Sequence, residues 1–230
     1  MFSLTPLEAD ALILSLKVAF WSVLCSLPLG IAIAWALARK EFVGKNLVNG
    51  LIHLPLVLPP VVVGYVLLIM LGRRGPVGGW LYDTFDITIA FTWKGAAIAS
   101  AVMAFPLMVR AIRLSIENVD TKLEAAARTL GAGPWRTFAT ITLPLTAPGI
   151  LAGVILAFAR SLGEFGATIT FVSNIPGETR TLPLAVFSQI EVPGGEEGAL
   201  RLVVISVVLA MAALLGSEVL ARRLARRMED

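Results

Sequence analysis

The chain has 230 residues, of which 57% are hydrophobic and only 15% are charged, and its formal net charge is +3. Soluble domains average about 45–50% apolar and about 25% charged residues, so this composition excludes an ordinary soluble protein. The basic residues lie beside apolar runs rather than in one patch, which favours a topology signal over a nucleic-acid surface. We predict an all-α, polytopic integral membrane protein in which residues 1–230 form a single transmembrane domain.

The first apolar run covers about residues 11–38 and is followed by a short basic loop at residues 39–46. Pro28 and Gly30 inside the run predict a kink rather than an end, because neighbouring helices can satisfy the freed backbone groups. The first ten residues lack a basic segment typical of a cleaved signal. We therefore expect this run to remain as the first span.

The second run, residues 47–71, contains Pro55, Pro59 and Pro60, which cannot all lie in an undisturbed helix. Broken backbone inside a membrane is tolerated only where it is buried in protein or faces a water-filled cavity. Two interpretations stay open: the stretch with His53, Pro59 and Pro60 lines a pathway or an adjoining subunit interface, or it is a kinked packing helix. With one histidine and one cysteine in the chain, no His/Cys metal cluster is expected.

The rest of the chain alternates between apolar runs and turn-rich segments. Residues 72–87 have the glycine, proline and aspartate content of a loop, and so do residues 174–198. Further apolar runs cover residues 90–115, 141–172 and 200–220, which gives five predicted transmembrane helices, to which a short or re-entrant segment at residues 182–190 could add a sixth.

The distribution of lysine and arginine predicts the orientation. If the loop at 39–46, the segment at 110–140 and the C-terminus lie on one side, that side holds 12 of the 19 basic residues. The opposite loops hold three, namely Arg73, Arg74 and Arg180. By the positive-inside rule we expect an N-terminus outside, a C-terminus in the cytoplasm and a location in the cytoplasmic (inner) membrane.

One cytoplasmic segment, residues 120–135, predicts a helical elbow between two spans. Alanine, leucine, glutamate and arginine favour a helix from 120 to 130, Asp120 or Thr121 is a suitable N-cap, and Glu124 stands where a capping box places its acid. Gly131 can end that helix, and Pro134 cannot continue it. Such an elbow has a suitable shape for docking a soluble partner.

The elbow resembles the coupling loop of permease subunits of binding-protein-dependent ABC importers. In that pattern a Glu-Ala-Ala start is followed by a glycine, nine residues and Ile-x-Leu-Pro, and here Gly131 and Ile141-Thr142-Leu143-Pro144 match the spacing. Glu124 lies seven residues before the glycine instead of six, so a specific salt bridge is not carried over to it. The resemblance implies a coupling interface to an ATPase made by Leu123, Glu124, Ala126, Ala127, Leu130, Gly131, Ala132, Gly133 and Pro134.

Further stretches resemble the membrane subunit of molybdate ABC importers. They are residues 53–65, residues 105–113 and residues 158–181, and the similarity covers nearly the whole chain. The resemblance implies a type I importer fold, a homodimer, two cytoplasmic ATPase subunits and a periplasmic molybdate-binding protein. The chain lacks a Gly-x-x-x-x-Gly-Lys-Ser/Thr loop, so we expect no enzymatic activity and no cofactor in this subunit, ATP being used by its partner.

Polar residues in the fourth apolar run form a second candidate site. Arg160 and Glu164 are four residues apart and can pair on one helical face, either as a structural ion pair or as part of a gate. Thr168, Thr170 and Ser173 offer neutral groups that suit passage of an oxyanion without trapping it, although ordinary helix packing explains them equally well.

The sequence leaves three alternative functions open. A sulfate, thiosulfate or tungstate permease would have the same architecture. A stand-alone ion-coupled carrier would leave the elbow without a partner, and a membrane anchor without transport would not need a proline-broken second span.

Overall fold

Three long helices form the centre of the molecule: α1 (Pro6–Arg39), α5 (Trp93–Glu117) and α8 (Leu143–Leu162). The computed structural model describes residues 4–229, except the side chains of residue 214 and residues 217–229. Close packing of α5 against α8 depends on small residues, as is usual between membrane helices. A Cβ atom added to Gly149 would lie 2.0 Å from the Cβ of Ser115, so this crossing requires glycine.

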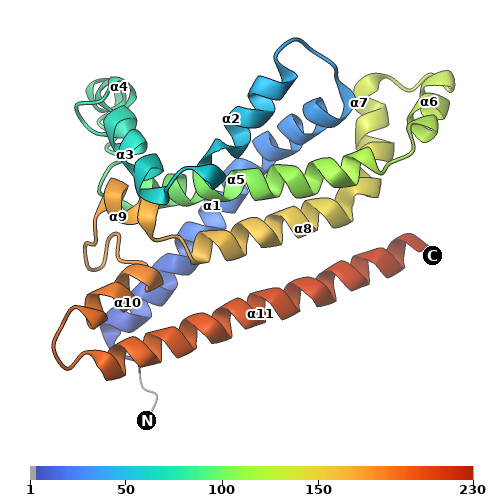
Figure 1. Cartoon of the computed structure of the whole chain (residues 1–230). Helices are drawn as coiled ribbons and strands as arrows, with labels where there is room; N and C mark the ends of the chain where they lie inside the picture. The colour runs from blue at the N-terminus through green and yellow to red at the C-terminus, as the bar shows by residue number, and fades with distance from the viewer. Residues whose placement is uncertain (1–3, 230) are drawn as a thin grey trace.

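Several shorter helices lie at the two ends of these long helices (Figure 1). At one end are α6 (Thr121–Thr129), α7 (Pro134–Thr137) and a π-helical turn, η1 (Phe138–Thr142); at the other are α9 (Gly166–Val172) and α10 (Leu182–Ile190). The last helix, α11 (Glu196–Glu229), runs from α10 towards the end that holds α6. An ion pair of 3.0 Å between Arg201 and the buried Glu8 ties the start of α11 to the start of α1.

The number of membrane spans is partly resolved by the structure. Within the described residues, α1, α5 and the continuous stretch Pro134–Leu162 are long and apolar enough to cross a membrane, and a bent pair of helices makes a fourth if the pair is counted as one span. The fifth predicted run lies in α11, and its basic residues at 222–227 lie outside the described side chains. Five spans therefore stays a prediction. The short segment at 182–190 does form a helix, but its nine residues extend only about 14 Å, too little to cross the membrane.

The second apolar run is broken more sharply than a kink. It forms α2 (Lys45–Val57) and α3 (Pro60–Leu71), whose axes are bent by 114° at Leu58 and Pro59. Pro60 occupies the first turn of α3, where a missing N–H costs nothing, while Pro55 is accommodated inside α2. The prediction of a broken run is confirmed.

The segment at 72–87 is not the predicted loop, because it contains α4 (Pro76–Phe85). Gly75 and Pro76 begin this helix, and Asp86, with a φ of 53°, ends it. A Cβ atom added to Gly78 would lie 2.2 Å from the carbonyl oxygen of Leu71. The glycines that indicate a turn in the sequence instead let α4 pack closely on the end of α3.

The fourth apolar run is also divided. Its helical stretch begins before the apolar run, at Pro134, and passes through η1 into α8, which ends at Leu162 with Gly163 as its C-cap. A break at 163–165 separates α8 from α9, so one predicted helix becomes two. Because the residues on both sides of the break are apolar, hydropathy alone does not predict it.

Candidate functional site

The elbow at residues 120–135 is a short helix closed at both ends by its own residues. The Asp120 side chain accepts a hydrogen bond of 2.9 Å from the backbone N–H of Lys122, which confirms Asp120 as the N-cap. At the other end Gly131 has a φ of +84°, and the N–H of Ala132 donates to the carbonyl of Ala127 at 3.0 Å. This is a Schellman ending, in which glycine adopts the left-handed conformation without strain.

Glu124 holds the elbow to the long helices. It is 7% exposed, and its Oε1 atom lies 3.2 Å from Arg39 Nη2 at the end of α1. The same oxygen accepts a hydrogen bond of 2.7 Å from the hydroxyl of Thr142 in η1. Arg39 also donates to the carbonyl oxygen of Val119 at 3.0 Å. One carboxylate therefore connects α6, α1 and the start of α8.

This arrangement corrects the prediction that Glu124 belongs to a capping box and that its offset removes it from a specific ion pair. The N-terminus of α6 is capped by Asp120, which leaves Glu124 free to turn towards α1. Sequence reasoning treated Arg39 only as a basic residue of a loop. Its partner is 85 residues away in the chain, so no local spacing pointed to it.

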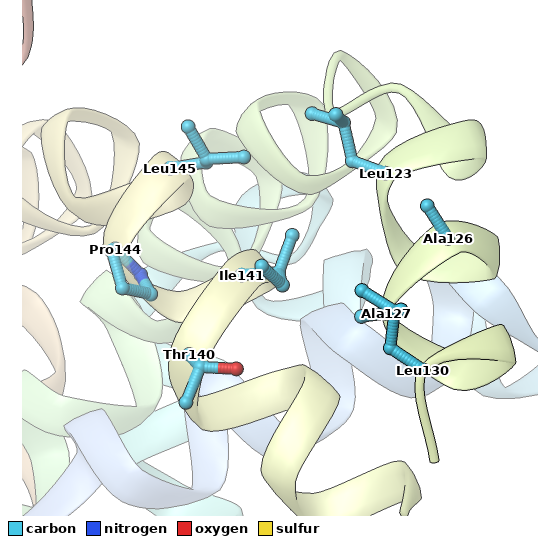
Figure 2. Close-up of a pocket in the computed structure, with 8 residues that line it drawn as sticks. All are labelled: Leu123, Ala126, Ala127, Leu130, Thr140, Ile141, Pro144 and Leu145. Atoms are coloured by element: carbon cyan, nitrogen blue, oxygen red, sulfur yellow. The ribbon is translucent and has the colours of Figure 1, made fainter. Parts of the chain in front are cut away.

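The opposite face of α6 is apolar and lines a groove of about 440 Å³ (Figure 2). One wall consists of Leu123, Ala126 and Ala127 of α6 with its C-cap Leu130. The other consists of Thr140 and Ile141 of η1 with Pro144 and Leu145 at the start of α8. Ile141 and Pro144, two fixed positions of the Ile-x-Leu-Pro pattern, thus form one wall of the groove.

The tip of the elbow exposes large apolar side chains. Leu130 is 89% exposed, Trp135 is 85% exposed and Leu123 is 49% exposed. Gly131 and Gly133 are also exposed and Ala132 is half-buried, next to Pro134 at the start of α7. Exposed apolar patches of this kind mark interaction sites. Of the predicted coupling residues, Glu124 is buried against α1, and the others lie around this accessible tip and the groove beside it. Trp135 was not among the predicted residues, although a tryptophan directly after the Gly-Pro turn is a visible signal.

The second candidate site lies at the other end of the long helices, at the break between α8 and α9. Arg160 Nη1 lies 2.6 Å from Glu164 Oε2, and the Glu164 side chain is buried. Glu164 Oε1 also accepts a hydrogen bond of 2.8 Å from the N–H of Ala167 in the first turn of α9. The predicted pair therefore forms, and its acid additionally satisfies a backbone donor that the break leaves free.

The neutral polar residues near this break are occupied by hydrogen bonds to the backbone. The Thr168 hydroxyl donates to the carbonyl of Phe165 and the Thr170 hydroxyl to that of Gly166, both at 2.8 Å. Ser173 has a φ of +64° at the end of α9 and is exposed. Because Thr168 is fully buried, only Thr170 and Ser173 of these three are accessible to a passing molecule.

The two broken helices touch each other. A Cβ atom added to Gly166 would lie 2.7 Å from Cβ of Pro60, and one added to Gly64 would lie 2.5 Å from the carbonyl oxygen of Ala167. The structure thus brings Pro60 together with the segment that follows Glu164. His53 lies on α2, where its Nδ1 atom is 2.8 Å from the carbonyl oxygen of Asn49.

Comparisons with known proteins agree with this geometry. Residues 26–230 match the profile of the family described as binding-protein-dependent transport system inner membrane component. The molybdenum transport system permease protein ModB of Escherichia coli K12 is 67% identical over 219 residues, covering 95% of this chain and 96% of that protein. The protein of the same name from Haemophilus influenzae is 60% identical over 222 residues, covering 96% and 97%.

A solved structure of a bacterial ABC transporter involved in the import of alginate is similar in fold. It matches with a TM-score of 0.74 and 18% identity, covering 96% of this chain and 80% of that chain. At this identity the likeness concerns the arrangement of helices alone.

The role of Glu124 generates a stability prediction. In Glu124→Gln the side chain keeps its shape and can still accept from Thr142, but Arg39 loses its anionic partner in a mostly buried position. Removing one member of a buried pair costs about 3–5 kcal/mol, so we expect the free energy of unfolding to fall by about 3 kcal/mol. The measurement is denaturant unfolding of the purified permease, followed by tryptophan fluorescence.

Glu41→Gln is the matched control for this substitution. Glu41 forms an ion pair of 2.7 Å with Lys45, but its side chain is 89% exposed. Exposed pairs contribute only about 0–1 kcal/mol, so this variant should unfold close to the wild-type midpoint. Equal unfolding of the Glu124 and Glu41 variants would contradict the role given to Glu124.

Proposed function

This chain belongs to the family of binding-protein-dependent transport system inner membrane components, and we propose that it is the permease subunit of an ATP-driven molybdate importer. Molybdate is supported by the high identity to two permeases named for molybdenum transport, over nearly the whole of both proteins. The proposed coupling to an ATPase rests on the exposed apolar elbow, which Glu124 fixes to α1 and to the start of α8.

The elbow is the proposed joint to a cytoplasmic ATPase. Its exposed tip at Leu123, Leu130 and Trp135 provides an apolar contact, and the Arg39–Glu124 pair transmits movement of α6 to α1. A rigid connection is needed because ATP is bound and hydrolysed by the partner, while transport occurs between the long helices. Each permease has one elbow, so two ATPase subunits require two copies of this chain.

The exposed face of α2 and α3, the two halves of the broken second run, is the proposed contact with a second copy of this chain. No residue of α2 is buried in the single chain, and its exposed side chains include Leu47, Leu51 and Val57. On α3, Val61 and Tyr65 are exposed in the same way. A pathway between two copies would place the broken helices beside it, which is where irregular backbone is tolerated in a membrane.

We infer the orientation in the membrane from the distribution of basic residues and from which segments lie at each end of the long helices. The basic loop at 39–46 and the elbow lie at the same end of the long helices, which we propose to be cytoplasmic. The start of α1, together with α9 and α10, then faces the periplasm and the substrate-binding protein. This arrangement corresponds to an N-terminus outside and a C-terminus inside the inner membrane.

Two other functions are less well supported. A sulfate, thiosulfate or tungstate permease shares the architecture, and the binding protein is expected to set most of the selectivity. A stand-alone carrier driven by an ion gradient would transport without an ATPase and would not need the apolar tip of the elbow.

The proposed function is tested by uptake of labelled molybdate into proteoliposomes. We expect uptake only when the permease, its ATPase, its binding protein and ATP are all present, with weaker competition from unlabelled sulfate than from molybdate. Uptake by the permease alone, driven by a proton or sodium gradient, would contradict the ATP-driven mechanism. Stronger competition by sulfate would reassign the substrate while leaving the mechanism in place.

The ion pair at the α8–α9 break is proposed to be part of the gate. In Glu164→Gln the hydrogen bond to the N–H of Ala167 can persist, whereas the charge pairing with Arg160 is lost. If that pairing changes between inward-facing and outward-facing states, uptake should fall by about tenfold, the effect of roughly 1.4 kcal/mol on a barrier. The assay is uptake in the same proteoliposomes, with the amount of assembled complex measured in parallel. Wild-type uptake would leave Arg160 and Glu164 as a structural pair only.

A further inference from the structure

A second cavity lies on the polar side of the elbow, opposite the apolar groove. It has a volume of about 340 Å³ and is enclosed by the end of α1, the polar face of α6 and the start of the α7–η1 segment. Its lining includes Arg39, Lys40, Glu124, Arg128 and Thr137. Helix α6 thus presents one face to each of two cavities, one apolar and one polar.

The charge of this cavity is positive. Arg39, Lys40 and Arg128 contribute three cations, while Glu124 is the single carboxylate in the lining. Glu124 is already paired with Arg39. Among the residues that the structure describes, no ion pair involves Lys40 or Arg128. Two positive charges therefore face the cavity without a negative partner.

A buried hydroxyl in the same lining also lacks a partner. Thr137 is 2% exposed, and within the described part of the chain its Oγ1 atom has no hydrogen-bond partner. Buried polar atoms are nearly always hydrogen-bonded, so an unpaired hydroxyl in the wall of a cavity is a donor available to a bound group. Because the hydroxyl can donate and the two cations attract anions, the group that suits this cavity is an acceptor with negative charge.

The aromatic and basic residues around the cavity are of the kind found at the level of lipid headgroups. The rings of Trp35 and Phe138 meet edge to face with centroids 6.1 Å apart, and Lys40 Nζ lies 5.1 Å from the Trp35 ring. Tryptophan and lysine together at the end of a membrane helix are typical of the interfacial region, where anionic headgroups attract basic side chains.

We propose that this basic cavity binds a phosphate-type oxyanion at the elbow. The group is supplied either by the headgroup of an anionic phospholipid or by a free oxyanion from the cytoplasm. The anion accepts a hydrogen bond from Thr137 and bridges Lys40 of α1's end with Arg128 of α6. Its binding adds a second connection between α1 and α6 beside the Arg39–Glu124 pair, so occupancy stabilises the position of the elbow.

The test uses the full-length permease in two kinds of nanodisc, without its partners. In the first, made of phosphatidylcholine with phosphatidylglycerol, native mass spectrometry measures the phosphatidylglycerol that the protein retains. In the second, made of phosphatidylcholine alone, inorganic phosphate is titrated and the unfolding temperature is recorded. Retention in the first assigns the site to a lipid headgroup, and stabilisation in the second assigns it to a free oxyanion.

Thr137→Val is the decisive variant, because it removes the unsatisfied hydroxyl and preserves the shape of the side chain. The protein should fold at least as well as the wild type but bind the anion about tenfold more weakly. Lys40→Ala should weaken binding similarly. Lys45→Ala is the matched control, since it removes a nearby basic residue at the start of α2 that does not line the cavity.

The proposal is overturned by either of two results. One is an absence of both lipid retention and phosphate stabilisation in the wild-type permease. The other is equal binding by the wild type, Thr137→Val and Lys40→Ala. Equal loss of binding in Lys45→Ala would likewise overturn it, because it would indicate a diffuse effect of surface charge. The assays contain no ATPase and no molybdate, so their outcome is independent of the proposed transport function.

Discussion

The position of the elbow depends on a single buried carboxylate. Helix α6 has nine residues, and isolated helices shorter than about 12–15 residues are marginal in water, so contacts with the rest of the chain must hold it. Glu124 provides them by pairing with Arg39 at the end of α1 and accepting from Thr142 before α8. The helix is thereby attached to two of the three central helices, while its apolar face and its tip remain free. Fixed attachment with an accessible tip is the property a mechanical joint requires.

The opposite end of the molecule follows a different constraint, the need to satisfy backbone groups where helices break inside a membrane. The break before α3 and the break before α9 lie against each other, at Pro60 and Gly166. Glu164 accepts a hydrogen bond from the N–H of Ala167, which the break leaves free, and it pairs with Arg160. One carboxylate therefore satisfies a backbone donor and neutralises the charge of an arginine. The two ends are joined by the long helices α1, α5 and α8, whose tight packing makes them suitable for carrying movement from one end to the other.

Local features of the chain were predictable, and distant pairings were not. The extent of α6, its cap at Asp120 and its ending at Gly131 follow from short-range chemistry that the sequence displays directly. The ion pair of Glu124 with Arg39 joins residues 85 positions apart, and the break after Gly163 sits within continuous apolar sequence. Helix α4 was missed because Gly78 indicates a turn when read alone, whereas its purpose is a close approach to Leu71. The basic cavity combines residues from three segments, so only the fold brings Lys40, Arg128 and Thr137 together.

Substitution at Gly131 tests most directly whether the elbow couples ATP hydrolysis to transport. In the single chain nothing lies within 4 Å of a Cβ atom placed there, so a bulky side chain affects a docked partner rather than the permease core. The measurement is molybdate transported per ATP hydrolysed by the reconstituted complex. Gly131→Ala is the control, since alanine shares the strain of the left-handed conformation but adds little bulk. Our account predicts that Gly131→Trp lowers this ratio at least about tenfold (roughly 1.4 kcal/mol of lost coupling) relative to Gly131→Ala. A wild-type ratio in Gly131→Trp would contradict it.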